Sequence, residues 1–581
     1  MSNQELEIAK QWAANSYFEA EDRKEIQQLI DDNQQDEILD RFYRDLEFGT
    51  GGLRSHFGMG RNRINRYTVR RATQAMVNVI KSERPSMVIS YDSRRGSEFL
   101  AKEAASVLAA NGVKAYIFDR LNPVPLLSFA IRHLKADAGI MITASHNPPS
   151  YNGFKAFWSN GAQVTPPHDQ NIIEVYNGLT NWEQITYRPF EEGEEQKRIE
   201  WIGKEIEDLY HQMLASYCLN PELCRERGNE IKIVYTPIHG TGKVPCMRAL
   251  KDIGLTNVQI VPEQAEPDER FSTVSSPNPE DPEALELGVK LMQDTQADLV
   301  LGTDPDTDRV GVVCRDGEEL SYLNGNQIGI LMLNYILERK KATGELGAND
   351  QVVKTIVTSE LQAEIAQAYG LKIHNTLTGF KWIGKLMTDL ENQDSGKFLF
   401  ASEESFGYLS HPNVRDKDGV NAVALISEVA LHYKTQGMTL VDALNQIYKL
   451  YSFAQENLMT LKYEGKAGAE KITRIMDHFR NSPISEMAGL KIIQKEDYQS
   501  LQTLNYSTNE SSSINLPASN VIGFEFEGGP KLYLRPSGTE PKIKFYIMLK
   551  HSEGSLEEKK AWADQKIGQI RELISTLVEP I

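Results

Sequence analysis

A serine in a polar turn follows an apolar stretch in the first third of the chain. The apolar residues 140–142 run into Thr-Ala-Ser-His-Asn-Pro at 143–148. A buried strand would fix where this turn begins, and the turn would present the small hydroxyl of Ser145. A serine held in this way can carry a covalent group during catalysis. Because Ser, Asn and Pro also form ordinary turns, the motif alone is equally consistent with a structural loop.

Three carboxylates lie within five residues at the end of a second apolar stretch. The segment 302–309 reads Gly-Thr-Asp-Pro-Asp-Thr-Asp-Arg and contains Asp304, Asp306 and Asp308. Their mutual repulsion is costly unless a cation lies among them. Hard oxygen ligands suit Mg²⁺. The segment therefore predicts a magnesium site.

The sequence of this acidic segment does not match two other known kinds of site, an EF-hand calcium loop and the nucleophile loop of an Asp-x-Asp phosphatase. An EF-hand loop that began at Asp304 would need Gly at its sixth position and Glu at its twelfth, where the chain has Arg309 and Arg315. An Asp-x-Asp phosphatase would have Thr or Val at the fifth position, where the chain has Asp308.

A basic and hydroxylic motif near the C-terminus is suited to phosphate. The segment 534–542 reads Leu-Arg-Pro-Ser-Gly-Thr-Glu-Pro-Lys. Arg535 can form a bidentate contact with a phosphate group, and Ser537 and Thr539 add hydroxyl donors. Gly538 lets backbone N–H groups approach an anion.

Two weaker motifs complete the set. The segment 402–407, Ser-Glu-Glu-Ser-Phe-Gly, offers carboxylates and hydroxyls that can bind the vicinal diols of a sugar. The segment 48–54, Phe-Gly-Thr-Gly-Gly-Leu-Arg, is rich in glycine and ends on a basic residue. It lacks the Lys-Ser/Thr ending of a P-loop and the spacing of a dinucleotide fingerprint.

Alternating strands and helices position these motifs. Residues 1 to about 45 predict helix. Beyond them, strands at 87–91 and 114–118 flank a helix at 98–110, a βαβ pattern that implies a mainly parallel sheet covered by helices. Three predicted strands each end in a polar loop, at 140–143, 299–302 and 398–401. Ligands bind at the carboxyl ends of strands in open α/β sheets.

The predicted fold class is α/β, with three related α/β domains of mixed, mainly parallel sheets and a C-terminal α+β domain around a central cleft. In the last domain we expect a helix at 467–480, a loop-rich segment at 491–515 and several strands. The predicted domains are 1–205 with the helical extension and the serine loop, 206–325 with the metal loop, 326–455 with the sugar loop, and 456–581 with the phosphate loop.

The composition is that of a globular protein and argues against nucleic-acid-binding, membrane-spanning and secreted proteins. The 581 residues are 40% hydrophobic and 25% charged, as in ordinary globular proteins. A net charge of −18 argues against a nucleic-acid partner. The chain has no apolar run near the ~20 residues that span a bilayer, and its polar N-terminus predicts no secretory signal. Four cysteines without metal-ligand spacing favour a reducing compartment, so we expect a cytoplasmic protein with no membrane partner.

The ordered motifs resemble those of the α-D-phosphohexomutases, the phosphoglucomutase and phosphomannomutase superfamily. Thr-Ala-Ser-His-Asn-Pro, Asp-Pro-Asp-x-Asp-Arg, Glu-x-Ser-x-Gly and Arg-Pro-Ser-Gly-Thr-Glu-Pro occur in the family order. The resemblance extends from about Phe48 to the C-terminus. The helical extension and the Phe-Gly-Thr-Gly-Gly-Leu-Arg opening are similar to the long branch that holds bacterial phosphoglucomutases and phosphopentomutases.

The resemblance implies an intramolecular phosphotransferase of the isomerase class, and it implies roles for single residues. Ser145 would be phosphorylated, and one Mg²⁺ per chain would bind to its phosphoserine and to Asp304, Asp306 and Asp308. Further catalytic positions would be His146, Lys155, Arg54 and Arg309. Substrate-binding positions would be Thr378, Gly379, Glu403, Ser405, Lys417, Arg535, Ser537, Gly538 and Thr539.

The leading hypothesis is interconversion of glucose 1-phosphate and glucose 6-phosphate, with glucose 1,6-bisphosphate as intermediate and activator. Small sugar phosphates would be the partners, and the protein would be a monomer or a homodimer. A phosphopentomutase or a glucose 1,6-bisphosphate synthase would use the same fold, whereas Phe380 and Phe406 disfavour a phosphomannomutase. A sugar-phosphate sensor and a phosphatase are more distant alternatives. The general base stays open among His146, His239 and Lys155.

Overall fold

The computed structural model describes residues 3–49, 51–537 and 541–581. The chain divides into two compact units. The first unit contains Met1–Asn324, Phe380–Phe400 and Ser405–Gln436, and the second contains Gly325–Gly379, Ala401–Glu404 and Gly437–Ile581.

Three helices open the first unit and confirm the helical prediction for this region: α1 (Asn3–Ala14), α2 (Ala20–Asp31) and α3 (Gln35–Phe42). Their apolar faces form a separate core with Tyr67. In it Trp12 stacks on Phe18 with ring centroids 4.4 Å apart. Aromatic rings bury a large apolar area, so this core fixes the helices on the domain that follows.

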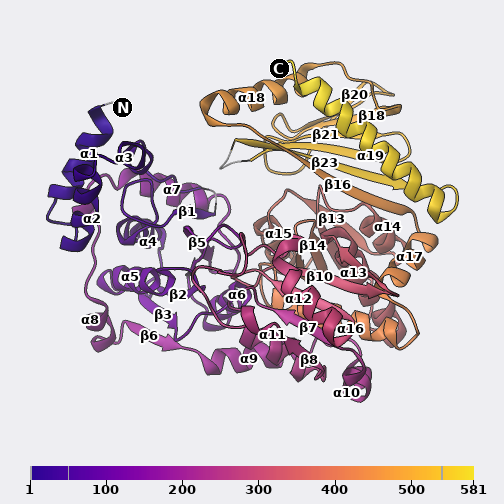
Figure 1. The fold of residues 1–581 in the computed structure, drawn as a ribbon, viewed down its shortest axis with the longest axis horizontal. Helices are drawn as coiled ribbons and strands as arrows, with labels where there is room; N and C mark the ends of the chain where they lie inside the picture. The colour runs from indigo at the N-terminus through magenta and orange to yellow at the C-terminus, as the bar shows by residue number, and fades with distance from the viewer. Residues whose placement is uncertain (1–2, 50, 538–540) are drawn as a thin grey trace. The chain divides into compact units, whose positions relative to one another are not determined.

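The first sheet has the order β1-β5-β4-β2-β3-β6 (Figure 1). Strand β2 pairs in parallel with β3 and β4, while β5 pairs antiparallel with β4 and β1. Helix α5 packs on β2, β3 and β4, and α6 packs on β2 and β4. The elements are β1 (Gly52–His56), α4 (Arg66–Val79), β2 (Ser86–Tyr91), α5 (Ser97–Ala110), β3 (Lys114–Phe118), α6 (Val124–Leu134), β4 (Ala138–Ile142), β5 (Tyr151–Trp158), α7 (His168–Gly178), η1 (Trp182–Gln184), α8 (Phe190–Glu195) and β6 (Ile199–Ile202).

Burial on both faces explains why β4 is a continuous apolar run, since every residue of this strand is buried. A glycine allows the close approach of its neighbour β5. A Cβ at Gly153 would lie 2.5 Å from the carbonyl oxygen of Thr143 and 2.7 Å from that of Leu53. Glycine at this position therefore lets β5 lie between β1 and β4 directly beside the serine loop.

The second sheet, also in the first unit, has the order β11-β10-β9-β7-β8. Strand β7 pairs in parallel with β8 and β9, and β10 pairs antiparallel with β9 and β11. Helix α12 packs on β7 and β9. The elements are α9 (Lys204–Ala215), α10 (Pro221–Arg227), η2 (Gly228–Glu230), β7 (Ile233–Thr236), α11 (Lys243–Asp252), β8 (Val258–Ile260), η3 (Pro262–Gln264), α12 (Pro282–Thr295), β9 (Leu299–Thr303), β10 (Val310–Asp316) and β11 (Glu319–Leu323).

A buried histidine of α9 makes the stability of the fold depend on pH. His211 is 3% exposed, and burial lowers its pKa to about 4, with Arg248 adding to the effect. The unfolded chain, with a histidine pKa of about 6.5, binds a proton that the folded chain does not, so stability is lost as the pH falls from about 6.5 toward 4. We expect the protein to lose about 2 kcal/mol at this site between about pH 7.5 and pH 5.

The measurement is the urea unfolding midpoint at both pH values for the protein and for His211→Asn. Because the other titrating groups are shared, the difference between the two proteins isolates His211. The variant should show the smaller change with pH, and an equal change in both would contradict the assignment.

The third sheet has the order β13-β12-β14-β15, and its strand β14 runs from the first unit into the second. Strands β12 and β13 pair in parallel. The elements are α13 (Gly325–Thr343), β12 (Asp350–Thr355), α14 (Leu361–Ala368), β13 (Lys372–Thr376), α15 (Phe380–Gln393), β14 (Lys397–Glu403), β15 (Gly407–Leu409), α16 (Gly419–Lys434) and α17 (Leu440–Leu450).

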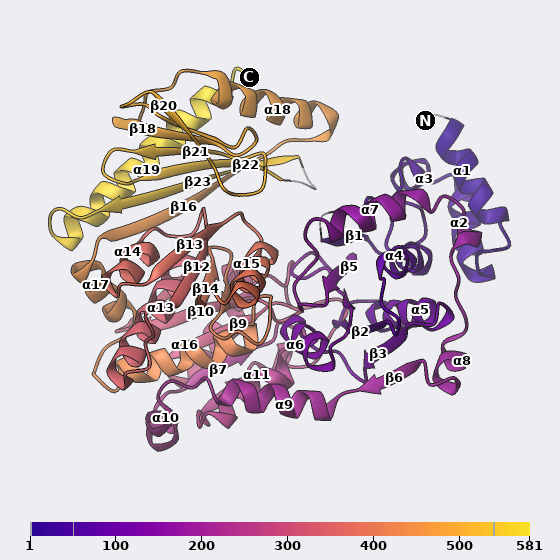
Figure 2. The same cartoon turned by 180° about the vertical axis from the view of Figure 1, so that it is seen from behind.

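The fourth sheet, in the second unit, is antiparallel, with α19 packed on β16 and β23 and α18 on β21 and β23 (Figure 2). Its main path is β16-β23-β22-β21-β18-β19-β20. The elements are β16 (Phe453–Lys462), α18 (Gly465–Asn481), β17 (Glu486–Met487), β18 (Leu490–Asp497), β19 (Gln502–Asn505), β20 (Glu510–Ser513), β21 (Ile522–Phe526), β22 (Lys531–Pro536), β23 (Lys542–His551) and α19 (Leu556–Val578).

The loop-rich segment predicted at 491–515 is wrong, because it forms most of β18 together with β19 and β20. These strands carry few apolar residues, and β20 is exposed along its length. Their backbone groups are paired through the hairpin registers of β18 with β19 and of β19 with β20. Strands with little buried side-chain area leave almost no hydrophobic pattern in the sequence.

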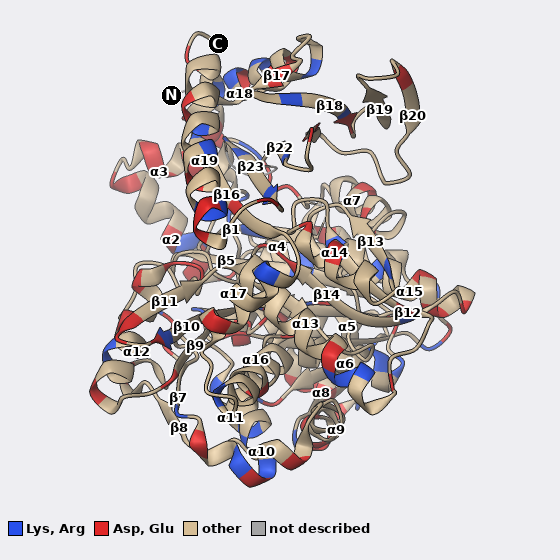
Figure 3. Cartoon of the chain, turned by 90° about the vertical axis from the view of Figure 1, so that its right-hand side faces the viewer, with Lys and Arg blue, Asp and Glu red and all other residues tan. Residues whose placement is uncertain are grey.

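The α/β fold class with a C-terminal α+β domain is confirmed by these four sheets. Among the described residues, no helix has both the length and the apolar composition needed to cross a membrane. Lys and Arg are interspersed with Asp and Glu in helices such as α2, α10 and α19 (Figure 3).

Candidate active site

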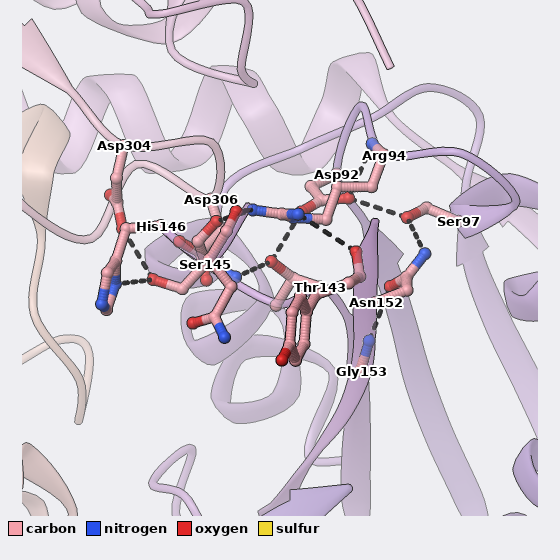
Figure 4. A network of polar contacts seen from close by, with 12 residues as sticks. Asp92, Arg94, Ser97, Thr143, Ser145, His146, Asn152, Gly153, Asp304 and Asp306 are labelled. Atoms are coloured by element: carbon pink, nitrogen blue, oxygen red, sulfur yellow. Dashed lines mark hydrogen bonds and ion pairs between the residues drawn. The ribbon is translucent and has the colours of Figure 1, made fainter. Parts of the chain in front are cut away.

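Ser145 lies just beyond the carboxyl end of β4 and is 3% exposed. Its φ of 51° is in the left-handed region, which is uncommon for a residue with a side chain. The Oγ atom donates to Asp304 Oδ2 at 2.8 Å and lies 3.2 Å from His146 Nδ1 (Figure 4). The serine loop and the acidic loop therefore meet at this hydroxyl.

The three aspartates occupy the loop between β9 and β10 and are almost fully buried, with Asp304 and Asp306 at 0% and Asp308 at 2% exposure. Each offers one ligand oxygen, and these oxygens all lie within 4.8 Å of one another. Asp304 Oδ1 accepts the backbone N–H groups of Asp308 at 3.0 Å and Arg309 at 3.1 Å. The loop thus folds around the first carboxylate and turns the other two toward it.

The donor set of this loop fits a small divalent cation. Asp306 Oδ1 and Asp308 Oδ1 are buried, and neither has a hydrogen-bond partner among the described residues. Buried carboxylate oxygens without a partner are costly, and a hard cation would satisfy them. The group formed by Asp304, Asp306 and Asp308 is accordingly a candidate metal centre.

Two lysines face the same carboxylates. Lys155 of β5 donates to Asp306 Oδ2 at 2.6 Å and to Asp308 Oδ2 at 3.3 Å. Lys417 Nζ lies 3.1 Å from Asp308 Oδ2. Burial alone would raise the pKa of Asp308, but Lys417 and Lys155 hold it well below its usual range. The pKa of Lys155 is raised in turn, because both aspartates outweigh its burial, so this lysine is a cation at neutral pH.

Asp304 has the opposite electrostatic environment. Its pKa is raised well above the usual range by burial and by the charges of Asp308 and Asp306. A single site thus holds one carboxylate that resists ionisation and one that is strongly ionised. A bound cation would relieve the repulsion between these carboxylates, which is part of the reason that the pKa of Asp304 is raised.

His146 is a neutral imidazole at the serine. Burial lowers its pKa well below the usual value, and the charges of Arg309 and Arg54 lower it further. Its own backbone carbonyl accepts from Ser276 Oγ at 2.8 Å, which holds the loop. A neutral ring nitrogen 3.2 Å from Ser145 Oγ is within reach to accept the hydroxyl proton.

Arginines lie on both sides of this site. Arg54 of the edge strand β1 donates to Asn147 Oδ1 at 3.1 Å in the serine loop. Arg309 forms an ion pair with Glu280 and lies 3.8 Å from the carboxylate of Asp308. The first unit therefore brings nine predicted site residues into one connected group: Arg54, Ser145, His146, Lys155, Asp304, Asp306, Asp308, Arg309 and Lys417.

Ser405 also belongs to the first unit, in the turn between β14 and β15. The carbonyl of the next residue, Phe406, accepts from the backbone N–H of Val310 at 3.1 Å. This bond ties the predicted sugar loop to the strand that follows the three aspartates.

The remaining predicted positions lie in the second unit. The backbone N–H of Gly379 donates to Glu403 Oε1 at 2.8 Å, which joins the Thr378–Gly379 turn to the end of β14. Arg535 is at the end of β22, and Ser537 N–H donates to the carbonyl of Lys542 at 2.8 Å. Gly538 and Thr539 lie outside the described residues.

Two features were missed by the sequence predictions. Asp92 and Arg94 contact the serine loop, and their signal is an Asp-x-Arg at the end of β2.

The second feature is a group of two cysteines and a glutamate. The Sγ atoms of Cys218 and Cys224 lie 3.8 Å apart, and with Glu428 they form a group that could hold a metal ion, although the spacing of the cysteines indicated none. The contact with Cys224 and burial raise the pKa of Cys218, which keeps this thiol protonated.

His239 lies in the loop that follows β7. Its ring nitrogens lie 3.0 Å from the carbonyl oxygen of Glu266 and 2.9 Å from Thr273 Oγ1. Both ring nitrogens of His239 are thus engaged within its own loop region. The histidine whose ring lies 3.2 Å from Ser145 Oγ is His146.

Comparison with known proteins identifies the family. Models of phosphoglucomutase/phosphomannomutase α/β/α domains I, II and III match residues 45–182, 208–317 and 324–451. A phosphoglucomutase of Staphylococcus haemolyticus is 39% identical over 87% of this chain and 91% of its own length. One of Staphylococcus aureus is 38% identical over 89% of this chain and 92% of its own length.

Solved structures share the fold. A putative phosphomannomutase of Thermus thermophilus superposes with a TM-score of 0.66 at 21% identity and covers 92% of this chain and 99% of its own. The phosphoglucomutase parafusin of Paramecium, in its open form, superposes with a TM-score of 0.64 at 17% identity and covers 92% of this chain and 94% of its own. With an aspartate triad at the serine and three family domains in order, this chain belongs to the phosphoglucomutase/phosphomannomutase family of enzymes.

Proposed function

We propose that this protein is a phosphoglucomutase that interconverts α-D-glucose 1-phosphate and glucose 6-phosphate. The observation that carries the proposal is the 2.8 Å contact between Ser145 Oγ and the buried aspartate group. Staphylococcal relatives that are 36–39% identical over most of the chain bear the name phosphoglucomutase, which supports the choice of sugar.

Ser145 is the proposed carrier of the phosphoryl group. A sugar hydroxyl attacks the phosphorus of phosphoserine as its proton passes to a base, the Oγ–P bond breaks, Oγ takes up a proton, and glucose 1,6-bisphosphate forms. After the bisphosphate reorients, Ser145 Oγ attacks the phosphorus of the other phosphate and its proton leaves for a base. The bond between that phosphorus and the sugar oxygen breaks, and the sugar oxygen takes up a proton. His146 is our candidate for that base, because its neutral Nδ1 lies 3.2 Å from Oγ.

Asp304, Asp306 and Asp308 would hold one Mg²⁺, with a phosphoserine oxygen as a further ligand. The ion would supply charge neutralisation for the transferring phosphoryl group. Lys155 and Arg309, which are cations beside the same carboxylates, would stabilise the equatorial oxygens of that group.

The other predicted positions would bind the rest of the substrate. We assign the sugar hydroxyls to Glu403 and Ser405 and the recognition of sugar orientation to Thr378–Gly379. The phosphate that does not react would bind to cationic and hydroxylic groups, namely Lys417, Arg535, Ser537, Gly538 and Thr539. Arg54, which donates to Asn147 in the serine loop, is kept as a proposed catalytic position. Arginine suits this task because its planar fork matches phosphate oxygens.

The test is a coupled assay of glucose 1-phosphate conversion with Mg²⁺ and a trace of glucose 1,6-bisphosphate. Rapid formation of glucose 6-phosphate, abolished by a chelator and restored by Mg²⁺, is the expected result. Product from ribose 1-phosphate alone would make the protein a phosphopentomutase. Net release of inorganic phosphate would make it a phosphatase.

Replacing Lys155 should separate metal binding from turnover. In Lys155→Met the ammonium no longer competes for Asp306 and Asp308, so Mg²⁺ should bind about 10-fold more tightly. Turnover should fall about 100-fold, because a cation beside the reacting phosphoryl group is lost. Titration calorimetry with Mg²⁺ and the coupled assay measure the two effects, and the exposed Lys24→Met on α2 is the control. Unchanged or weaker Mg²⁺ binding in Lys155→Met would contradict this role.

We further propose a cytoplasmic enzyme with domains at 1–205, 206–325, 326–455 and 456–581, active as a monomer or a homodimer. Its four free thiols support a reducing compartment. Light scattering of the purified protein measures the oligomeric state, and limited proteolysis near the three boundaries tests the division.

A further inference from the structure

We propose that the buried ion pair of Asp92 and Arg94 holds the peptide backbone of Ser145 from both ends and so positions its hydroxyl for phosphoryl transfer. The inference rests on the proposed function, because it concerns the same serine. It makes Asp92 and Arg94 positioning residues of that reaction, which act through the loop and contact no substrate.

The carbonyl end is held by Arg94 (Figure 4). Its Nη2 donates to the carbonyl oxygens of Ser145 and Asn147, the latter at 2.5 Å. Its Nη1 donates to the carbonyl oxygens of Pro148 at 2.9 Å and Tyr151 at 3.1 Å. One planar guanidinium therefore binds four carbonyls between residues 145 and 151. A lysine ammonium, which is a compact point charge, cannot reproduce this fork.

The amide end is held by Asp92 through a hydroxyl. The N–H of Ser145 donates to Thr143 Oγ1 at 2.8 Å, and Thr143 Oγ1 donates to Asp92 Oδ2 at 2.6 Å. Asp92 Oδ2 lies 3.3 Å from Arg94 Nε. Its other oxygen accepts from the Arg94 backbone N–H at 2.9 Å and from Ser97 Oγ at 2.7 Å. The network thus forms a closed ring from the amide of Ser145 to its carbonyl.

Burial separates this pair from any ligand. The side chains of Asp92 and Arg94 are both 0% exposed, and the guanidinium carbon lies 4.9 Å from the centroid of the Phe271 ring. A hydrogen bond to a charged group is strongest where water is excluded. The two residues are therefore placed to act on the reaction through the serine loop, and Arg94 also interacts electrostatically with Asp306 and Asp304.

The backbone of Ser145 explains why such fixation is needed. A φ of 51° is strained for serine, and strained conformations persist only where the surroundings over-determine them. Without the ring of bonds the loop would relax and move Oγ away from Asp304 and His146. Phosphoryl transfer to or from Oγ is sensitive to the position of this atom, and a displacement of 1 Å can lower the rate about 100-fold.

The test is the single-turnover rate constant for phosphorylation of Ser145 by glucose 1,6-bisphosphate with Mg²⁺, followed by rapid quench and protein mass. We expect about a 100-fold decrease in Arg94→Met and about a 10-fold decrease in Arg94→Lys and in Thr143→Val. The KM for glucose 1-phosphate should stay within about twofold, because no substrate contact is lost. The control is Arg95→Met, since this neighbouring arginine is exposed and lies over Phe57.

The rate constant distinguishes positioning from a loss of folded protein. Misfolding reduces the amplitude of the turnover and leaves the rate constant of the remaining active enzyme unchanged. A normal rate constant in Thr143→Val and in folded Arg94→Lys would overturn the proposal. If the arginine variants do not fold, a normal rate constant in Thr143→Val alone would overturn it. In the double variant Thr143→Val/Arg94→Met, the decrease should be smaller than the product of the single decreases, because both act on one loop.

Failure of the proposed function gives a different result. If the unmodified protein takes no phosphoryl group from glucose 1,6-bisphosphate and converts no glucose 1-phosphate, the proposed function is wrong, and the positioning role in that reaction is wrong with it. If the unmodified protein turns over and the variants match it, only the positioning role is wrong.

Discussion

Ser145→Ala should abolish turnover while the protein stays folded. The variant lacks the oxygen that carries the phosphoryl group, and removal of a nucleophile costs at least about 10⁴-fold in kcat. Binding of glucose 1-phosphate should change by less than about twofold, because the proposed phosphate and sugar contacts come from other residues. The coupled assay and calorimetry with glucose 1-phosphate measure these two quantities.

A matched control for this variant lies in the same loop. Ser150 is exposed, and Ser150→Ala should keep turnover within about twofold of the unmodified protein. Incubation with glucose 1,6-bisphosphate should add one phosphoryl group to Ser150→Ala and none to Ser145→Ala, as measured by protein mass. Substantial turnover in Ser145→Ala, or phosphorylation of that variant, would rule out the assigned carrier.

Asp306→Asn should weaken Mg²⁺ binding at least about 100-fold and lower kcat about 10³-fold. Asp306 is fully buried, and its Oδ1 has no hydrogen-bond partner among the described residues. The amide is nearly isosteric, but it removes one negative charge and one anionic ligand from the group. It also breaks the 2.6 Å ion pair with Lys155.

The measurements for Asp306→Asn are Mg²⁺ calorimetry and the dependence of turnover on Mg²⁺ concentration. High Mg²⁺ should restore part of the activity if the defect is in metal affinity. The control is Asp294→Asn on α12, where the aspartate is exposed. If Asp306→Asn bound Mg²⁺ normally, the metal would have to lie elsewhere.

Much of the fold was predictable because its strands are buried on both faces. Strand β4 is apolar along its length, and β9, whose five residues are all buried, begins with the apolar run Leu-Val-Leu, so both strands can be recognised from apolar residues that lead into polar loops. The helices α1 to α3 were predictable from their apolar faces. The strands β19 and β20 were not, because backbone pairing rather than side-chain burial defines them.

The candidate site likewise contains residues that could be predicted from the sequence and residues that could not. Asp304, Asp306 and Asp308 are close in sequence, so their common chemistry can be read from their spacing. Glu280 gave no such signal, although it forms the ion pair with Arg309. These two partners are 29 positions apart in the sequence and are brought together only by the packing of the second sheet and its loops.

The sequence by itself determined which chemical groups the protein can offer, since a nucleophilic hydroxyl, a carboxylate triad and a phosphate-binding arginine are local patterns of residue type. The tertiary structure alone decided how these groups are combined. Ser145 and Asp304 are separated by 159 residues and meet at 2.8 Å, and Asp92 and Arg94 are linked to the loop of Ser145 across 51 or more residues. The physical reason is that the pKa of a carboxylate and the orientation of a hydroxyl depend on neighbouring groups. Packing brings these neighbours together, and residue order alone does not specify them.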